Sequence, residues 1–219
     1  MIEKNSAFKV FEINMERTNM LIQAVEKISA YNFLYQEKAY DISPYHRNIV
    51  KAVQDKELEK ISNSCYEHAI ISIATTFETY LKELVQELLF KHGDYFLNLD
   101  SKWKERINAL IDDSEKYDFE IILNRLNLKN RFQIIEFLDT YNLILLTPDQ
   151  ENLINSIYIK RNNFVHNGSI LSKKAKIQIT ELNKVDKEKY FDLSIKWTRT
   201  KFKRMMIKVH ENIFQKLNE

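Results

Sequence analysis

The stretch of sequence that decides the fold is residues 63–93, NSCYEHAIISIATTFETYLKELVQELLFKHG. Its apolar residues recur every three or four positions, which is the period of an α-helix and places them on one broad face. That face comprises Ile70, Ile73, Ala74, Phe77, Leu81, Leu84, Val85 and Leu88. We expect the helix to end at His92 and Gly93, because histidine suits the negative end of the helix dipole and glycine suits the left-handed cap.

Helical patterns also cover most of the remaining chain. The 219 residues include only two glycines and two prolines, so sharp turns must be few. Apolar spacing and turn signals predict further helices at residues 7–40, 44–60, 94–142 (two or three short ones), 148–167 and 192–217. Residues 176–181 alternate between polar and apolar side chains in the manner of a short β segment. We therefore expect an all-α fold with this one short β segment.

The same patterns indicate a single domain. Apolar residues make up 44% of the chain, which is enough to bury a sizeable core, and no internal repeat or obvious linker interrupts it. We expect one helical domain over residues 1–219. Within it, residues 1–60 form an N-terminal helical extension packed on a core at residues 62–217.

Cysteine usage and hydropathy predict a cytoplasmic protein. Cys65 is the single cysteine, which fits a reducing compartment. The N-terminus lacks the apolar stretch of a signal peptide, and we find no apolar run long enough to cross a bilayer. His46, His68, His92 and His210 show no metal-ligand spacing with one another or with Cys65. We expect no metal, no cofactor and no membrane partner.

Charge is distributed unevenly along the chain, although the net charge is only +2. Residues 153–219 hold 15 Lys and Arg against 6 Asp and Glu, a net charge of +9, so the remainder carries −7. A basic C-terminal third is compatible with a polyanionic partner. It is equally compatible with attraction between the two parts of the chain or to a second subunit.

The helix expected at residues 148–167 has a strong start signal. Thr147 can cap it, Pro148 takes the first helical position, and Gln150 completes a capping box. At about 100° per residue, the apolar side chains gather on one face with Arg161 near its middle. The apolar residues on that face are Leu153, Ile154, Ile157, Phe164 and Val165. Asn162 and His166, four positions apart, lie together at the edge of the same face.

A guanidinium on a core-facing stripe needs an anionic or hydrogen-bonding partner, because it cannot lose its charge. Glu78 lies on the flank of the apolar face of the 63–93 helix and is a candidate partner for Arg161. One interpretation is that Arg161 only ties helices together through an ion pair. The other is a functional site, which the convergence of arginine, asparagine and histidine at one helix end favours.

The segment Arg161-Asn162-Asn163-Phe164-Val165-His166 resembles the Arg-x4-6-His motif of the HEPN superfamily, in which asparagine often follows the arginine. Phe77-Glu78-Thr79-Tyr80-Leu81 is similar to the "FExYL" helix of standalone bacterial HEPN proteins. The resemblance spans roughly residues 62–217. It implies an HEPN-like helical bundle.

Membership of this family would imply a metal-independent endoribonuclease. Two protomers would pair so that both motifs line one cleft, and attack by the ribose 2′-OH would cleave RNA. The resemblance implies that His166 transfers protons, Arg161 stabilises the phosphate, and Asn162 orients the phosphate or the histidine. Glu78, as the expected partner of Arg161, is a further candidate catalytic residue. Basic residues that we expect to guide the RNA backbone are Lys160, Lys173, Lys174, Lys196, Arg199, Lys203 and Arg204.

Gly168 marks a departure from some HEPN toxins, which carry a tyrosine two residues after the histidine. Control by modification of such a tyrosine is therefore not expected here. The resemblance implies a role in antiviral defence, or in a toxin–antitoxin pair with an antitoxin or other partner protein. The alternative is a non-catalytic HEPN-like module that binds RNA, nucleotides or a protein.

The expected pairing of Glu78 with Arg161 makes a prediction about stability. In a double-mutant cycle, Glu78→Ala and Arg161→Ala should couple by about 0.5–3 kcal/mol in the free energy of unfolding, since each removes the partner of the other. Denaturant unfolding of the two single variants and the double variant measures the coupling. Strictly additive effects would reject the pair.

Overall fold

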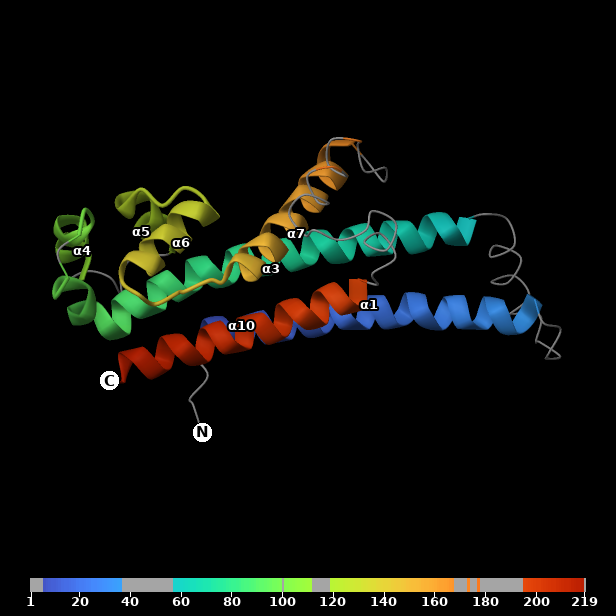
Figure 1. Cartoon of the computed structure of the whole chain (residues 1–219), viewed down its shortest axis with the longest axis horizontal. Coiled ribbons are helices and arrows are strands. Elements are labelled where there is room, and N and C mark those ends of the chain that lie inside the picture. Colours follow the sequence, from blue (N-terminus) through green and yellow to red (C-terminus); the bar gives the residue numbers. More distant parts are fainter. Residues whose placement is uncertain are drawn as a thin grey trace. The chain divides into compact units, whose positions relative to one another are not determined.

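A computed structural model describes residues 6–36, 57–99, 101–111, 119–167, 173, 177 and 195–218. Within these residues the chain is helical and contains no strand, which confirms the all-α prediction (Figure 1). Seven helices have described bounds. They are α1 (Ser6–Gln36), α3 (Glu57–Leu97), α4 (Lys104–Ile111), α5 (Phe119–Leu126), α6 (Arg131–Thr140), α7 (Pro148–Asn167) and α10 (Ile195–Leu217).

Helix α3 is longer than the sequence predicts. It continues through His92, whose backbone angles (φ −134°, ψ 33°) are not helical, and ends at Leu97 after this kink. The predicted end at His92 and Gly93 therefore coincides with the kink, and a further helical stretch follows it up to Leu97. The added turn carries Phe96, which is fully buried against other aromatic rings, and this burial favours continuation over termination.

The short β segment expected at residues 176–181 is not found where the structure can be described. Ile177 is helical, and the other residues of that segment lie outside the described residues. Most of the helix predicted at 44–60 also lies outside them, and its last residues belong to α3. Residues 94–142 form the short helices α4, α5 and α6, as predicted.

The chain divides into two compact units, each assembled from separate segments. The first unit comprises Met1–Asn14, Thr75–Glu151 and Lys201–Glu219, and the second comprises Met15–Ala74 and Asn152–Thr200. None of these boundaries falls near residue 60, where we expected an N-terminal extension to end. The boundaries instead fall within α1, α3, α7 and α10.

The core of the first unit contains a histidine among aromatic rings. The imidazole of His210 stacks on Phe8 of α1, with ring centroids 4.1 Å apart. Its Nδ1 lies 3.2 Å from the hydroxyl of Tyr80 on α3, and burial raises the pKa of this tyrosine. Phe202 of α10 meets Phe77 edge-on, at 5.4 Å between centroids. Residues at the start of α1 thus pack against α3 and α10.

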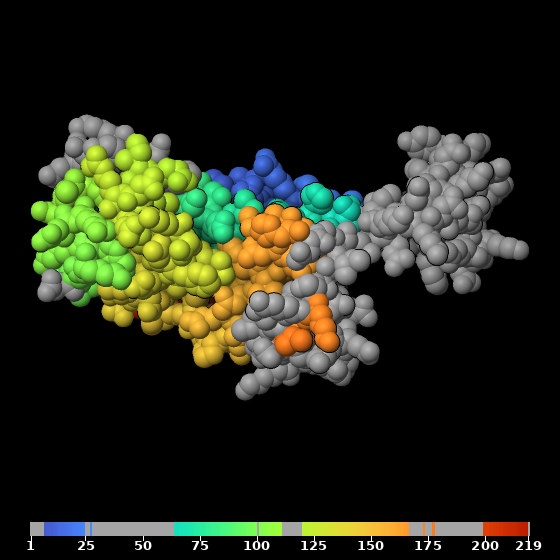
Figure 2. Space-filling view, turned by 90° about the horizontal axis from the view of Figure 1, so that it is seen from above, coloured from blue at the N-terminus to red at the C-terminus, as the bar shows by residue number. Residues whose placement is uncertain are grey.

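A second aromatic cluster in the first unit holds the short helices. Phe96 contacts Tyr141 at 4.7 Å between centroids, and Trp103 meets Phe137 edge-on at 5.2 Å. The hydroxyl of Tyr95 donates a hydrogen bond to the Tyr141 carbonyl oxygen (2.9 Å). Figure 2 shows α4, α5 and α6, coloured green to yellow, forming one continuous surface.

The second unit joins α1, α3 and α7. The hydroxyl of Tyr158 on α7 donates a hydrogen bond to the Ala74 carbonyl oxygen (3.1 Å), and the hydroxyls of Thr18 and Ser72 lie 2.8 Å apart. The apolar side chains buried in this unit are Met15, Ile22, Ala69, Ile70, Ile73, Ala74, Leu153, Ile154, Ile157 and Tyr158. The unit therefore combines an apolar core with buried polar contacts between helices.

The buried contact between Tyr80 and His210 predicts a measurable stability cost. Tyr80→Phe should lower the free energy of unfolding by about 1–3 kcal/mol, because it leaves a buried polar partner without its hydrogen bond. Tyr66→Phe is the matched control, since the half-buried Tyr66 has no described hydrogen bond. Denaturant unfolding should show a clear loss for the first variant only. Equal effects of the two changes would contradict a specific role for the hydrogen bond.

Candidate functional site

The start of α7 matches the predicted capping box. The Thr147 amide donates to Oε1 of Gln150 (2.8 Å), and the Gln150 amide lies 3.4 Å from Oγ1 of Thr147. Pro148 is the first helical residue, and Asp149 and Glu151 add negative charge to the first turn. Reciprocal capping and the helix dipole together fix where α7 begins. The helix ends at Asn167, as predicted, and so carries the complete Arg161–His166 segment.

The buried face of α7 is rotated from the face that the sequence predicts. Near its start, the expected apolar residues are buried. Towards its end, however, Val165 is 49% exposed and Arg161 is only half-buried, whereas Lys160 and Asn163 are buried. Ser156, which precedes Lys160 by four positions, is buried as well. The buried row therefore follows residues 156, 160 and 163, and the prediction that Arg161 faces the core is wrong.

Lys160 is the most unusual residue of this row. We expected it on the surface as an RNA contact, but its side chain is only 8% exposed. Burial lowers the pKa of its ammonium group from 10.5 to about 8, because desolvation penalises the charged form. A long aliphatic stem allows lysine to enter an apolar surface where a shorter charged side chain would not fit. In this position Lys160 is not presented to a polynucleotide.

Arg161, Asn162 and His166 are brought together at the surface of the last turns of α7. The Arg161 guanidinium donates a hydrogen bond to Oδ1 of Asn162 (3.0 Å). Asn162 and His166 are exposed and one helical turn apart, so they share a side of the helix. His166 lies in the last turn, where a positive charge is favoured by the helix dipole. The three polar groups that the motif singles out are thus accessible to a ligand.

The remaining predicted site residues include members of α3 and α10. Glu78 is half-buried on α3 and belongs to the first unit, whereas Arg161 belongs to the second. Their pairing stays a prediction. Arg199, also in the second unit, is half-buried and donates a hydrogen bond to Oδ1 of Asn19 (2.5 Å). Its guanidinium is thereby engaged within the protein.

The other basic residues predicted to contact RNA differ in exposure. Lys173 and Arg204 are exposed, and Lys203 is half-buried. Lys174 and the side chain of Lys196 lie outside the described residues. The exposed members are therefore compatible with the expected role, whereas the buried position of Lys160 is not.

Buried polar residues on α7 are the features that sequence reasoning missed. Ser156, Lys160 and Asn163 follow a spacing of four and three, which is one row of a helix. This spacing was visible in the sequence, but polar residues give no reason to assign a buried face.

Among the described residues, no group of three or more His, Cys, Asp or Glu side chains is arranged to hold a metal ion. No helix in the described part of the chain is long and apolar enough to cross a membrane.

Comparisons with known proteins add no relative. A scan against models of protein families, a search of curated proteins and a search of solved structures each found no match. The resemblance to the HEPN superfamily thus depends on the motif residues alone.

The buried Lys160 predicts a pH-dependent effect on stability. The difference in free energy of unfolding between Lys160→Met and the native protein should depend on pH, because the variant lacks a charge that burial disfavours. In the native protein this penalty is fully present below pH 8 and is relieved as the pH rises from about 8 towards 10.5, since the unfolded chain then binds the extra proton. The free energy of unfolding of the variant, measured relative to that of the native protein, should therefore fall over that range.

Denaturant unfolding at pH 7, 8.5 and 10 measures this difference. Lys173→Met is the matched control, because Lys173 is exposed and should show little effect at any of these pH values. A constant difference between Lys160→Met and the native protein across the range would contradict a depressed lysine pKa.

Proposed function

We propose that the protein is a metal-independent endoribonuclease of the HEPN type. The observation that carries this proposal is the position of Arg161, Asn162 and His166 on the last turns of α7. Asn162 and His166 are exposed, Arg161 is half-buried, and Asn162 accepts a hydrogen bond from the arginine. A purely structural arginine would be expected to pair with a buried acidic group. Here the described hydrogen bond of Arg161 goes to its neutral neighbour, which leaves most of the guanidinium donors for an anion.

The chemistry of these side chains fits cleavage of an RNA phosphodiester. Histidine titrates near neutral pH and can take the proton of a ribose 2′-OH as the oxygen attacks the adjacent phosphorus. Arg161 can fork onto the phosphate and stabilise the additional negative charge of the transition state. The bond from phosphorus to the 5′-oxygen then breaks, and that oxygen receives a proton. The products are a 2′,3′-cyclic phosphate and a 5′-hydroxyl.

Two proton transfers at one phosphate favour a site built from two copies of the chain. Each chain offers one histidine in the motif, and His166 is exposed and accessible to a partner. In a homodimer one His166 serves as base while the other protonates the leaving oxygen. The exposed Lys173 and Arg204 are candidates to hold the RNA backbone. The biological setting we propose is defence or a toxin–antitoxin pair with a neutralising protein.

RNA cleavage in EDTA tests this function directly. The protein should cut single-stranded RNA without metal, whereas RNA with 2′-O-methyl groups should stay intact because its nucleophile is blocked. His166→Ala and Arg161→Ala should each lower the cleavage rate by about 100-fold or more, as expected for loss of an acid–base group or of charge stabilisation. Product ends are identified by mass spectrometry.

Matched controls come from the same chain. His68→Ala removes an exposed histidine of α3, and Arg17→Ala removes an exposed arginine of α1, so both should cut at the native rate. Cleavage unchanged in His166→Ala would overturn its role, and cleavage that requires a metal would overturn the mechanism. Salt-sensitive RNA binding without any cleavage would reject the enzyme and support the non-catalytic binding module instead.

A further inference from the structure

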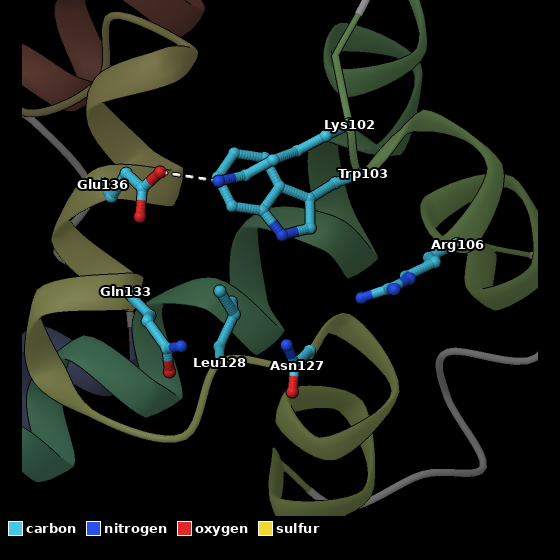
Figure 3. Close-up of a pocket in the computed structure, with 7 residues that line it drawn as sticks. All are labelled: Lys102, Trp103, Arg106, Asn127, Leu128, Gln133 and Glu136. Atoms are coloured by element: carbon cyan, nitrogen blue, oxygen red, sulfur yellow. Dashed lines mark hydrogen bonds and ion pairs between the residues drawn. The ribbon is translucent and has the colours of Figure 1, made fainter.

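A cavity of about 210 Å³ lies between the short helices of the first unit (Figure 3). Trp103 and Leu128 form buried parts of its wall, so little apolar surface is open to a ligand. The rest of the lining is polar and consists of Lys102, Arg106, Asn127, Gln133 and Glu136. This composition disfavours an apolar ligand and favours a small polar one.

The charged residues of the cavity are engaged unequally. The Lys102 ammonium lies 2.6 Å from Oε1 of Glu136 and 4.4 Å from the ring centre of Trp103. Its charge is therefore neutralised by the one carboxylate in the lining. Arg106 is exposed, and its single described hydrogen bond is a long one of 3.4 Å to the Leu126 carbonyl oxygen. The net charge of the lining is +1, and it is concentrated on Arg106.

Two amide side chains add donors to the same space. Gln133 accepts a hydrogen bond from the Lys129 amide through its carbonyl oxygen (2.7 Å), which leaves its NH₂ group free to donate. Asn127 adopts a left-handed backbone conformation (φ 59°), which asparagine tolerates better than most residues. Figure 3 shows its side chain and the Arg106 guanidinium directed into the cavity. Arginine and amide donors around a small space are the groups that bind oxyanions.

We propose that this cavity binds a small oxyanion, a carboxylate or a phosphate, with Arg106 as the principal contact and Asn127 and Gln133 as additional donors. The volume corresponds to roughly seven water molecules, enough for an anionic group with a few further atoms. Glu136 limits the affinity for an anion, because its carboxylate repels the anion and also forms an ion pair with Lys102. The site lies in the first unit and does not depend on the RNA-cleaving function proposed for α7.

Tryptophan fluorescence provides a direct test of binding. The chain has two tryptophans, so Trp197→Phe leaves Trp103 in the cavity wall as the sole reporter. In this background, titration with inorganic phosphate and, separately, with acetate should change the emission of Trp103 in a saturable way for at least one anion. The preferred anion distinguishes a phosphate site from a carboxylate site.

Charge variants distinguish specific binding of the anion in the cavity from its non-specific attraction to a basic surface. Arg106→Gln should raise the dissociation constant about tenfold or more, the cost of one charge-assisted hydrogen bond. Lys104→Gln, an equal loss of charge at an exposed residue of the same helix outside the cavity lining, should leave it within about twofold. Glu136→Gln should tighten binding several-fold, because it removes the repulsion and frees Lys102.

The opposite results overturn the proposal. Equal weakening by Lys104→Gln and Arg106→Gln would show binding to net positive charge alone. Unchanged affinity in both Arg106→Gln and Glu136→Gln would show that the anion binds elsewhere. Absence of any saturable response to both anions in the native cavity would reject the site. None of these measurements involves RNA, so their failure is distinguishable from failure of the proposed nuclease.

Discussion

The apolar face of α3 is the constraint on which the rest of the structure depends. This 41-residue helix contributes to the cores of both compact units, with Ile73 buried in one and Tyr80 and Leu84 in the other. An apolar face of that length cannot remain in water, so each unit must cover its own part of it. The first unit does so with α1 and α10, whose Phe8 and Phe202 contact α3. In the second, α7 anchors Tyr158 on the Ala74 carbonyl.

Features set by local sequence could be predicted, and features set by tertiary packing could not. The capping box of Thr147 and Gln150 depends on residues three apart, and the structure confirms it. The helical stretch of α3 beyond the kink at His92 depends instead on contacts of Phe96 with Phe137 and Tyr141, which are distant in the sequence. The local signal of His92 and Gly93 coincides with the kink, and the helical stretch that follows it buries Phe96. Local signals favour a helix end, but they do not enforce one.

The same distinction holds for the candidate site: the sequence indicates which residues form it, but not how deeply each one is buried. The motif alone singled out Arg161 and His166, because residue type and spacing are properties of the sequence. Their burial could not be derived, since a helical wheel places Arg161 and Val165 on the core side, whereas the structure buries the row containing Lys160. A half-buried Arg161 has less need of a buried acidic partner. The desolvation argument for Glu78 is therefore weaker, and the case for an anionic ligand is stronger.

Lys160 links the stability of the protein to pH. A buried ammonium with a pKa of about 8 is still mostly charged at neutral pH and disfavours the folded state. The same charge lies one residue before Arg161, in surroundings where electrostatic interactions are screened less than in water. Lys160 therefore makes the stability of the protein depend on pH, because its buried ammonium group loses its proton below the usual range of lysine.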